Sequence, residues 1–356
     1  MSSTLPRRLF VAGAAAMALI VAACGQAGGQ QRNGIWAAGS STVFPFATRV
    51  AENFGRNFPD GAPPRVESLG TGGGIQAFCQ GLGPTTPDIA NASRRLKASE
   101  FDQCAENGVT EIIEIKIGYD GLAVATARSG ADFVLEGSDL YLALAKEIPG
   151  PDGQLIPNPN RTWAQVRAGL PDVRIQVYGP PPTSGTRDSW NELAMLTSAE
   201  ALPALAALAE SDPDRFESVA QTLREDGGWV DSGENDNAIV QTLTRTPGSV
   251  GVFGYSFLEE NFGQVKPATV NGVTPTLDTI ASGQYPISRS MFIYVKKAHI
   301  GVTPGLQDFL IEFTSEAATG RGGYLQDRGM VPLPAAEREA QRAVAANLTV
   351  MTRPEE

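Results

Sequence analysis

The stretch GIWAAGSSTVFPFATRVAENF, residues 34–54, begins with a short apolar run, passes through small and hydroxylated residues, and continues with apolar residues at helical spacing. This order predicts a β-strand that leads through a turn into an amphipathic α-helix. The same plan recurs in residues 64–82, PRVESLGTGGGIQAFCQGL, and in residues 86–104, TPDIANASRRLKASEFDQC. Three such units in succession predict an α/β sheet, whose strand carboxyl ends gather on the side where open α/β folds bind ligands.

The rest of the chain continues this mixture of strands and helices. Residues 111–127 form a long β-rich run, and residues 173–179 and 285–297 predict further strands. Residues 196–223 are rich in Ala and Leu and predict helices, as does the amphipathic segment 305–316. The predicted fold class is therefore α/β.

The composition is that of a globular protein. The chain has 356 residues, 42% of them hydrophobic and 19% charged, which suits one large or two medium domains. The formal net charge of -11 leaves no basic surface for nucleic acid and does not favour adsorption to anionic lipid. Nucleic acid is therefore excluded as an expected partner.

The N-terminal segment has the features of an export signal. A pair of arginines precedes the run LFVAGAAAMALIVAAC, which is short for a membrane span but suits the apolar region of a secretory signal. The sequence VAAC resembles a lipobox, which implies removal of residues 1–23, acylation of Cys24 and a flexible tether over 24–33. Conventional cleavage near Ala23 stays open, as do general and twin-arginine export. We expect a periplasmic or cell-surface protein whose only membrane contact is a lipid anchor.

Two further cysteines, Cys79 and Cys104, form an even pair in a chain expected in an oxidising compartment. A disulfide between them is the default expectation. The chain has a single histidine, His299, so we expect no metal site. His299 follows a predicted strand, and we expect it to lie exposed in a loop.

Four predicted loops carry hydroxyls or glycines where a helix would begin. They are Ser40 to Thr42, Thr71 to Gly74, Ser93 with Arg94, and Ser184 to Arg187. Helix N-termini expose unpaired N–H groups and a partial positive charge, so several that converge would form an anion site. Each loop alone is as well explained by ordinary capping, because Ser and Thr are common N-caps. Four in one chain, two with an arginine, favour an anion site.

Common catalytic motifs are missing from the sequence. It contains no G-x-x-x-x-G-K-[ST] phosphate loop, no complete G-x-G-x-x-G and no G-x-S-x-G nucleophile elbow. A Ser/His/Asp triad would have to use His299. We therefore expect no enzymatic activity and no cofactor.

The order of the segments resembles the phosphate-binding proteins of bacterial ABC transporters, the PstS family. GSSTVFP, LGTGGGIQ, DIANASRRL and TSGTR resemble the four phosphate loops of that family in sequence order. GENDNAIVQTLTRTPGSVGVFGYSF and YPISRSMFIYVKK resemble its later segments, the second being a crossover strand. The similarity extends from Gly34 to about Met330.

The resemblance implies a two-domain periplasmic-binding-protein-like fold of type II. Two crossover strands would join the domains, and the ligand would lie in the cleft between them. The first domain would comprise residues 34–117 and 288–356, and the second residues 118–287. Closure would bring the first three loops onto the fourth.

Carried over residue by residue, the resemblance gives a phosphate site. Thr42 with its neighbours matches the first loop, Thr71 matches a serine in the second, and Ser184 to Thr186 match the Ser-Gly-Thr of the fourth. The full expected set is Ser41, Thr42, Val43, Thr71, Gly72, Ser93, Arg94, Ser184, Gly185, Thr186 and Arg187, with Asp188 and Asp236 as further candidates.

Two departures from the family pattern affect this site. The best-known members have an aspartate directly after the third-loop serine, where this chain has Arg94. They also have an arginine shortly before Ser-Gly-Thr, where this chain has prolines and instead places Arg187 directly after. We expect Arg94 and Arg187 to supply the positive charge.

The family aspartate accepts the proton of bound phosphate, so its replacement leaves the acceptor open among Asp188, Glu234 and Asp236. Phosphate carries a proton near neutral pH and sulfate does not, so a buried acceptor favours phosphate. Trp190 and Tyr255 are expected to pack in the core.

The function implied is capture of inorganic phosphate by a monomer and its delivery to ABC transporter permease subunits. The alternatives are another tetrahedral oxyanion such as sulfate or arsenate, a phosphate-sensing receptor, and a phosphate-monoester hydrolase.

Overall fold

The computed structural model describes residues 34–58, 61–233 and 236–355. The predicted signal peptide and tether, Cys24 and the candidate acceptor Glu234 lie outside these residues. Within the described part of the chain, no single helix is long and apolar enough to cross a membrane. One bent pair of helices, Gly185–Glu200 with Pro203–Ser211, is together long and apolar enough for a membrane span, by length and composition only.

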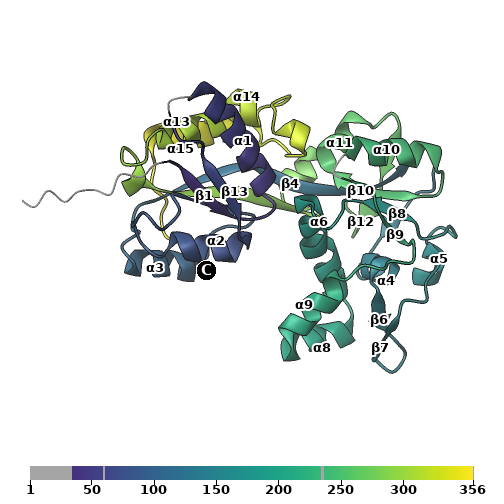
Figure 1. The fold of residues 1–356 in the computed structure, drawn as a ribbon. Helices are drawn as coiled ribbons and strands as arrows, with labels where there is room; N and C mark the ends of the chain where they lie inside the picture. The colour runs from purple at the N-terminus through teal and green to yellow at the C-terminus, as the bar shows by residue number, and fades with distance from the viewer. Residues whose placement is uncertain (1–33, 59–60, 234–235, 356) are drawn as a thin grey trace, which may run out of the picture.

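The first domain consists of segments from both ends of the chain. Its strands and helices are β1 (Trp36–Gly39), α1 (Phe44–Asn57), β2 (Arg65–Ser68), α2 (Gly70–Phe78), β3 (Ile89–Ala92), α3 (Ala98–Glu106), β13 (Ser288–Lys296), α13 (Leu306–Phe313), α14 (Glu316–Thr319) and α15 (Ala335–Asn347). Two short 3-10 turns, Lys297–His299 and Gln326–Arg328, complete it. Helices cover both faces of its sheet, with α1, α13 and α15 on one side and α2 and α3 on the other (Figure 1).

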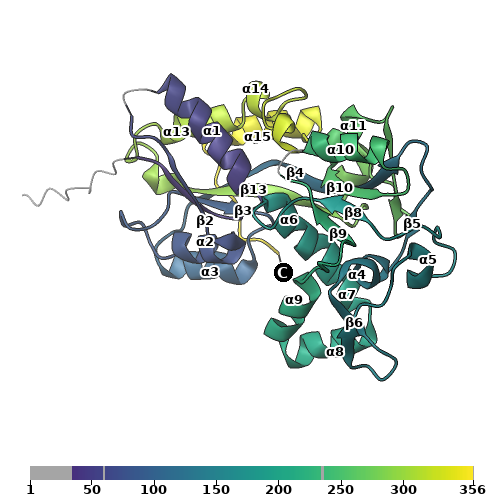
Figure 2. The same ribbon diagram turned by 45° about the vertical axis from the view of Figure 1, so that its right-hand side comes forward.

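The second domain is formed by the middle of the chain. Its elements are β5 (Val134–Leu135), α4 (Asp139–Leu144), β6 (Glu147–Pro149), β7 (Leu155–Pro157), α5 (Trp163–Val166), β8 (Val177–Gly179), α6 (Gly185–Trp190), a π-helical turn (Asn191–Leu196), α7 (Thr197–Glu200), α8 (Pro203–Ser211), α9 (Pro213–Gln221), β9 (Trp229–Asp231), α10 (Asp236–Arg245), β10 (Val250–Gly254), α11 (Tyr255–Glu260), β11 (Val265–Pro267), β12 (Thr269–Val270) and α12 (Leu277–Ala281). Figure 2 shows α10 and α11 above its sheet, with α6 and α9 below.

One long strand, β4 (Ile112–Ala127), runs from the first domain into the second (Figure 1). The strand order is β2-β1-β3-β13-β4-β10-β8-β9, with β11 also paired to β4. β13 pairs antiparallel with β4 over most of its length, so these two strands are the crossover between the domains. The sequence of β4 is rich in Ile, Val and Thr, which favour a continuous strand.

Buried side chains fall into separate cores. One cluster extends from Tyr119 to Ile287 and adds Val331 and Leu333, while two others hold the apolar faces of the first domain. In the first domain, α1 packs on α13 through an edge-to-face contact between Phe54 and Phe309, with ring centroids 5.5 Å apart. Trp190 and Tyr255 are buried, as predicted. The predicted α/β class is confirmed.

A disulfide joins Cys79, at the end of α2, to Cys104 in α3, which confirms the predicted pair. Both cysteines are fully buried in a small core beside β3. The bond therefore ties together the two helices on one face of the first-domain sheet.

Removing this bond should destabilise the protein. The cysteines are 25 residues apart, and the chain-entropy relation for a loop of that length gives about 3.5 kcal/mol. We expect Cys79→Ser with Cys104→Ser to lower the free energy of unfolding by about that amount in denaturant titrations. A reductant should lower the wild type to the same level and leave the double variant unchanged; a reductant-insensitive wild type would contradict the role of the bond.

The expectation that His299 lies exposed is wrong. Its side chain is buried, with Nδ1 2.8 Å from Asp88 Oδ1 and Nε2 3.1 Å from the Leu82 carbonyl oxygen. Asp88 also accepts hydrogen bonds from the Trp36 backbone N–H and from Thr303 Oγ1. The histidine is buried because a carboxylate far away in the sequence supplies a polar partner.

Candidate functional site

The first three predicted loops lie at one edge of the sheet. β1 pairs in parallel with β2 and with β3, and its last residue, Gly39, is opposite Ser68 and Asn91. Parallel strands in this register end together, so the turns that follow them come together at one edge. The pairing of these strands therefore brings the three loops side by side, as predicted.

The first loop requires a glycine at its start. Gly39 has φ +143°, and a Cβ atom there would lie 2.1 Å from the Asn91 carbonyl oxygen. The Ser40 N–H donates to that same oxygen at 2.9 Å, which holds the loop against β3. Ser41 follows and faces the space between the domains, while Val43 is buried at the start of α1.

The second and third loops are joined by their hydroxyls. Thr71 Oγ1 and Ser93 Oγ are 3.0 Å apart, and the Ser93 N–H donates to Thr71 Oγ1 at 3.1 Å. Thr71 lies in the first turn of α2, where backbone N–H groups have no helical partner. Two residues that sequence analysis assigned to separate loops thus form one hydroxyl pair beside a helix N-terminus.

The fourth loop brings the second domain against the first. Ser184 caps α6 by accepting a hydrogen bond from the Thr186 N–H at 3.3 Å. A Cβ atom added to Gly185 would lie 2.8 Å from the Ser41 carbonyl oxygen, so the backbones of the two domains approach closely here. Glycine allows this approach because it has no side chain.

Two cavities meet at Ser41. The larger is about 680 Å³ and the smaller about 250 Å³. The expected site residues on the larger are Ser41, Ser184, Gly185, Thr186, Asp188 and Asp236. Those on the smaller are Ser41, Thr71, Gly72, Ser93 and Arg94. Hydroxyl donors from all four loops therefore surround one cleft.

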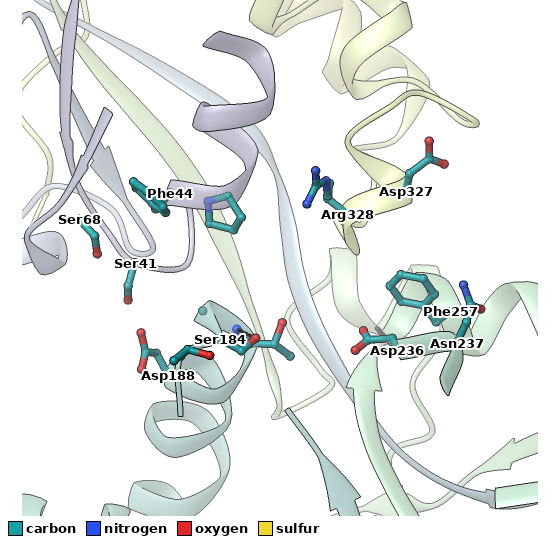
Figure 3. Close-up of a pocket in the computed structure, with 14 residues that line it drawn as sticks. Ser41, Phe44, Ser68, Ser184, Asp188, Asp236, Asn237, Phe257, Asp327 and Arg328 are labelled. Atoms are coloured by element: carbon teal, nitrogen blue, oxygen red, sulfur yellow. Dashed lines mark hydrogen bonds between the residues drawn. The ribbon is translucent and has the colours of Figure 1, made fainter. Parts of the chain in front are cut away.

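Two of the candidate proton acceptors differ in position. Asp188 lies next to Ser41, and burial raises the pKa of its carboxyl group. Asp236 accepts a hydrogen bond from the Gly254 N–H at 3.0 Å. In Figure 3, Asp188 lies next to Ser41, whereas Asp236 lies farther across the cavity, on the side of Arg328.

Arg94 lies on the wall of the smaller cavity and is held by Glu100. Its two terminal nitrogens donate to the two Glu100 oxygens at 2.9 and 2.7 Å. This pairing raises the pKa of the guanidinium, and the side chain is 36% exposed. Glu100 therefore fixes the orientation of Arg94.

Arg187 points away from both cavities. Its Nη1 donates to the Pro180 carbonyl oxygen at 2.8 Å and to Asp231 at 3.0 Å, and its guanidinium lies 4.7 Å from the ring centroid of Trp229. It lines a third cavity together with Asp231, and Asp188 borders both this cavity and the larger one. In this structure, Arg187 holds the start of α6 to β9.

Sequence analysis missed four charged residues that line the two cavities: Glu192, Arg289, Asp327 and Arg328. The most enclosed arginine among them is Arg289 of β13. Arg289 lines the smaller cavity with Ser41, Thr71 and Ser93. It also donates to Thr42 Oγ1, which explains why Thr42 is buried and lines neither cavity. The signal was an arginine within the crossover strand YPISRSMFIYVKK, close to its apolar run MFIYV.

A family model described as a PBP superfamily domain matches residues 25–317. The chain belongs to the PBP superfamily. This finding agrees with the two-domain α/β architecture and with a cleft between the domains.

Three similar proteins place the chain within that superfamily. Protein SphX of Synechococcus elongatus is 32% identical over 316 residues, which cover 86% of this chain and 79% of SphX. The phosphate-binding protein PstS of Staphylococcus saprophyticus is 29% identical over 345 residues, 94% of this chain and 93% of PstS. The crystal structure of a possible phosphate binding protein from Planctomyces limnophilus has 27% identity and a TM-score of 0.69, and covers 89% of this chain and 99% of that one. The resemblance to the PstS family is confirmed.

Proposed function

We propose that this protein binds inorganic phosphate in its interdomain cleft and delivers it to the permease of an ABC transporter. The observation that carries the proposal is the meeting of two cavities at Ser41, lined by hydroxyls and helix starts from both domains. Such donors suit a tetrahedral oxyanion. The names of the PstS relative and the Planctomyces limnophilus protein favour phosphate as that anion.

The binding set follows from the positions of the loops. Ser41, Thr71 and Ser93 would bind the anion from the first domain, with Gly72 offering a backbone N–H group and Arg94 a charge. The Val43 N–H, which donates to Ser40 Oγ at 3.4 Å in this structure, would exchange that weak bond for the anion. Ser184, Gly185 and Thr186 would bind it from the second domain. Arg187 would stabilise α6 from behind through Asp231, 3.0 Å away.

The domain limits of the proposal are residues 34–117 with 288–356, and 118–287. The separate cores support a division near these positions, because one cluster extends from Tyr119 to Ile287. Closure would rotate the domains about β4 and β13, the two strands that connect them.

The protein would work outside the cytoplasm, held to the membrane by a lipid on Cys24, and would catalyse no reaction. Both ring nitrogens of His299 are already engaged, by Asp88 and by the Leu82 carbonyl oxygen, so it is not placed to act as a general base in the cleft. A chromogenic phosphate ester should therefore not be hydrolysed; turnover at a rate that follows the protein concentration would favour the hydrolase instead.

Calorimetric titration tests the ligand. The purified chain should bind phosphate in a one-to-one ratio, bind arsenate, and bind sulfate far more weakly. Absence of phosphate binding, or tighter binding of sulfate, would overturn the proposed function.

We propose Asp188 as the group that accepts the phosphate proton. Its carboxylate lies beside Ser41, where both cavities meet, and a buried unpaired acceptor would repel sulfate. Asp188→Asn should lower the ratio of phosphate to sulfate affinity by roughly tenfold to a hundredfold, since an unmatched buried polar contact costs about 1–3 kcal/mol.

The comparison variant is Asp236→Asn, which alters a carboxylate on the same cavity that is bound to the Gly254 N–H. Its ratio of affinities should stay near that of the wild type in the same calorimetric titrations. If Asp236→Asn loses selectivity and Asp188→Asn keeps it, Asp236 is the acceptor.

A further inference from the structure

Arg289 lies where the two domains join. In the antiparallel pairing of β13 with β4, Arg289 is directly opposite Asp120, and its Nε is 3.5 Å from Asp120 Oδ2. Both residues therefore belong to the crossover strands. This position forms the floor of the cleft rather than either wall.

The guanidinium of Arg289 contacts both domains at once. Its Nη2 donates to Thr42 Oγ1 at 2.5 Å in the first domain and to Ser189 Oγ at 3.0 Å in the second. Its Nη1 pairs with Glu192, in the π-helical turn that continues α6. A single side chain thus bridges the first loop and the helix of the fourth loop.

Arg289 is better shielded from water than the other arginine of the smaller cavity. Its side chain is 13% exposed, against 36% for Arg94. Charges interact more strongly where water is excluded, so an anion beside Ser41 and Ser93 would gain more from Arg289. A planar fork on the cleft floor also suits a tetrahedral oxyanion.

The surroundings of Arg289 carry excess negative charge. Glu192 is 48% exposed, while Asp120 is almost fully enclosed and burial raises the pKa of its carboxyl group. Two carboxyl groups therefore pair with one guanidinium, and a third, that of Asp188, lies close enough to interact electrostatically with both Arg289 and Glu192. Of the two paired carboxyl groups, Glu192 is the more exposed, so it is the partner that can swing away when an anion enters.

We propose that Arg289 is the cation that binds the anion at the cleft floor, and that Glu192 is an internal counter-ion that the anion displaces. The inference rests on the proposed function. It adds Arg289 as a residue that binds the anion and Glu192 as a side chain that competes with the anion for Arg289. Arg187, bound to Asp231 behind α6, is not needed as a ligand in this arrangement.

The two residues should have opposite effects on phosphate affinity in calorimetry. Arg289→Gln should weaken binding by on the order of a hundredfold, as expected when one partner of a shielded charge pair is removed. Glu192→Gln should strengthen binding by about twofold to fivefold, because the anion no longer competes with a half-exposed ion pair. Unchanged binding in Arg289→Gln, or unchanged or weaker binding in Glu192→Gln, would overturn the corresponding half of the inference.

Matched variants separate this competition from general charge. Asp327→Asn removes one negative charge from the wall of the larger cavity, and should strengthen binding less than Glu192→Gln. Arg328→Gln removes a positive charge from the same wall, and should weaken binding far less than Arg289→Gln. Equal effects within each matched pair would show that only the overall potential of the cleft matters and would overturn the inference.

Folding and function are kept apart in the same experiment. Thermal unfolding shows whether each variant is folded. If Arg289→Gln is not folded, Glu192→Gln and Arg289→Lys test the inference in its place. Arg289→Lys keeps the positive charge and should lose less affinity than Arg289→Gln. The wild type is titrated first. Its failure to bind phosphate would refute the proposed function itself, whereas normal wild-type binding with an unaffected Arg289→Gln refutes this inference alone.

Discussion

Gly185→Ala should weaken phosphate binding by roughly tenfold to a hundredfold, the equivalent of about 1–3 kcal/mol of overpacking. The added methyl group would lie 2.8 Å from the Ser41 carbonyl oxygen, a backbone atom that cannot move aside without displacing the first loop. Because Gly185 begins α6, alanine is compatible with the helix. The loss should therefore appear in calorimetry, while α6 itself stays folded.

Gly73→Ala is the matched control. Gly73 lies in α2 and lines neither cavity, and a Cβ atom there would meet only the Leu69 Cβ atom at 3.5 Å, an ordinary contact. Its backbone N–H is retained in the variant, so phosphate affinity should stay close to that of the wild type. Equal losses in the two variants would show that the approach of Gly185 to Ser41 is not what limits binding.

Asp88→Ala should lower the free energy of unfolding by about 3–5 kcal/mol, as expected when one partner is removed from a buried polar network. Asp88 is fully buried and accepts hydrogen bonds from the Trp36 N–H and Thr303 Oγ1, while His299 Nδ1 lies 2.8 Å away. The substitution would leave these groups buried without their acceptor. Denaturant titration measures the loss.

Asp102→Ala provides the comparison. Asp102 forms a two-pronged ion pair with Arg353 at 2.8 Å, but both side chains are exposed, and such pairs contribute little because water screens them. Its unfolding midpoint should stay near that of the wild type. A similar loss in both variants would contradict the importance of burial for Asp88.

Much of the fold was predictable because it depends on local patterns. The spacing of apolar residues in the strand-to-helix units of the first domain and in residues 111–127 is typical of these elements and of few others. β4 covers nearly the whole of residues 111–127. The disulfide followed from an even pair of cysteines. These features depend on residue type and spacing, which are visible in a single sequence.

The charged residues of the cleft were harder to predict because their partners are distant in sequence. Arg289 meets Thr42, Asp120 and Glu192, and none of these contacts follows from the strand pattern around it. His299 was misplaced for the same reason, since its partner Asp88 belongs to another element.

The orientation of Arg187 could have been predicted from the sequence. In an α-helix, residues three or four apart share a face, so Asp188 and Ser189 follow Gly185 onto the side that meets the first loop. Arg187, two positions after Gly185, is turned to the opposite side, where Asp231 holds it. Helical periodicity applied to TSGTRDSW would have separated the two roles.

The position of β13 bears on how the chain reaches this structure. β13 lies between β3 and β4 in the sheet, although nearly the whole second domain separates it from them in sequence. The sheet of the first domain thus has a gap at its centre until the late part of the chain arrives. We expect folding to be slow and dominated by distant contacts, and a nascent chain that ends before Ser288 to remain unable to close its N-terminal core.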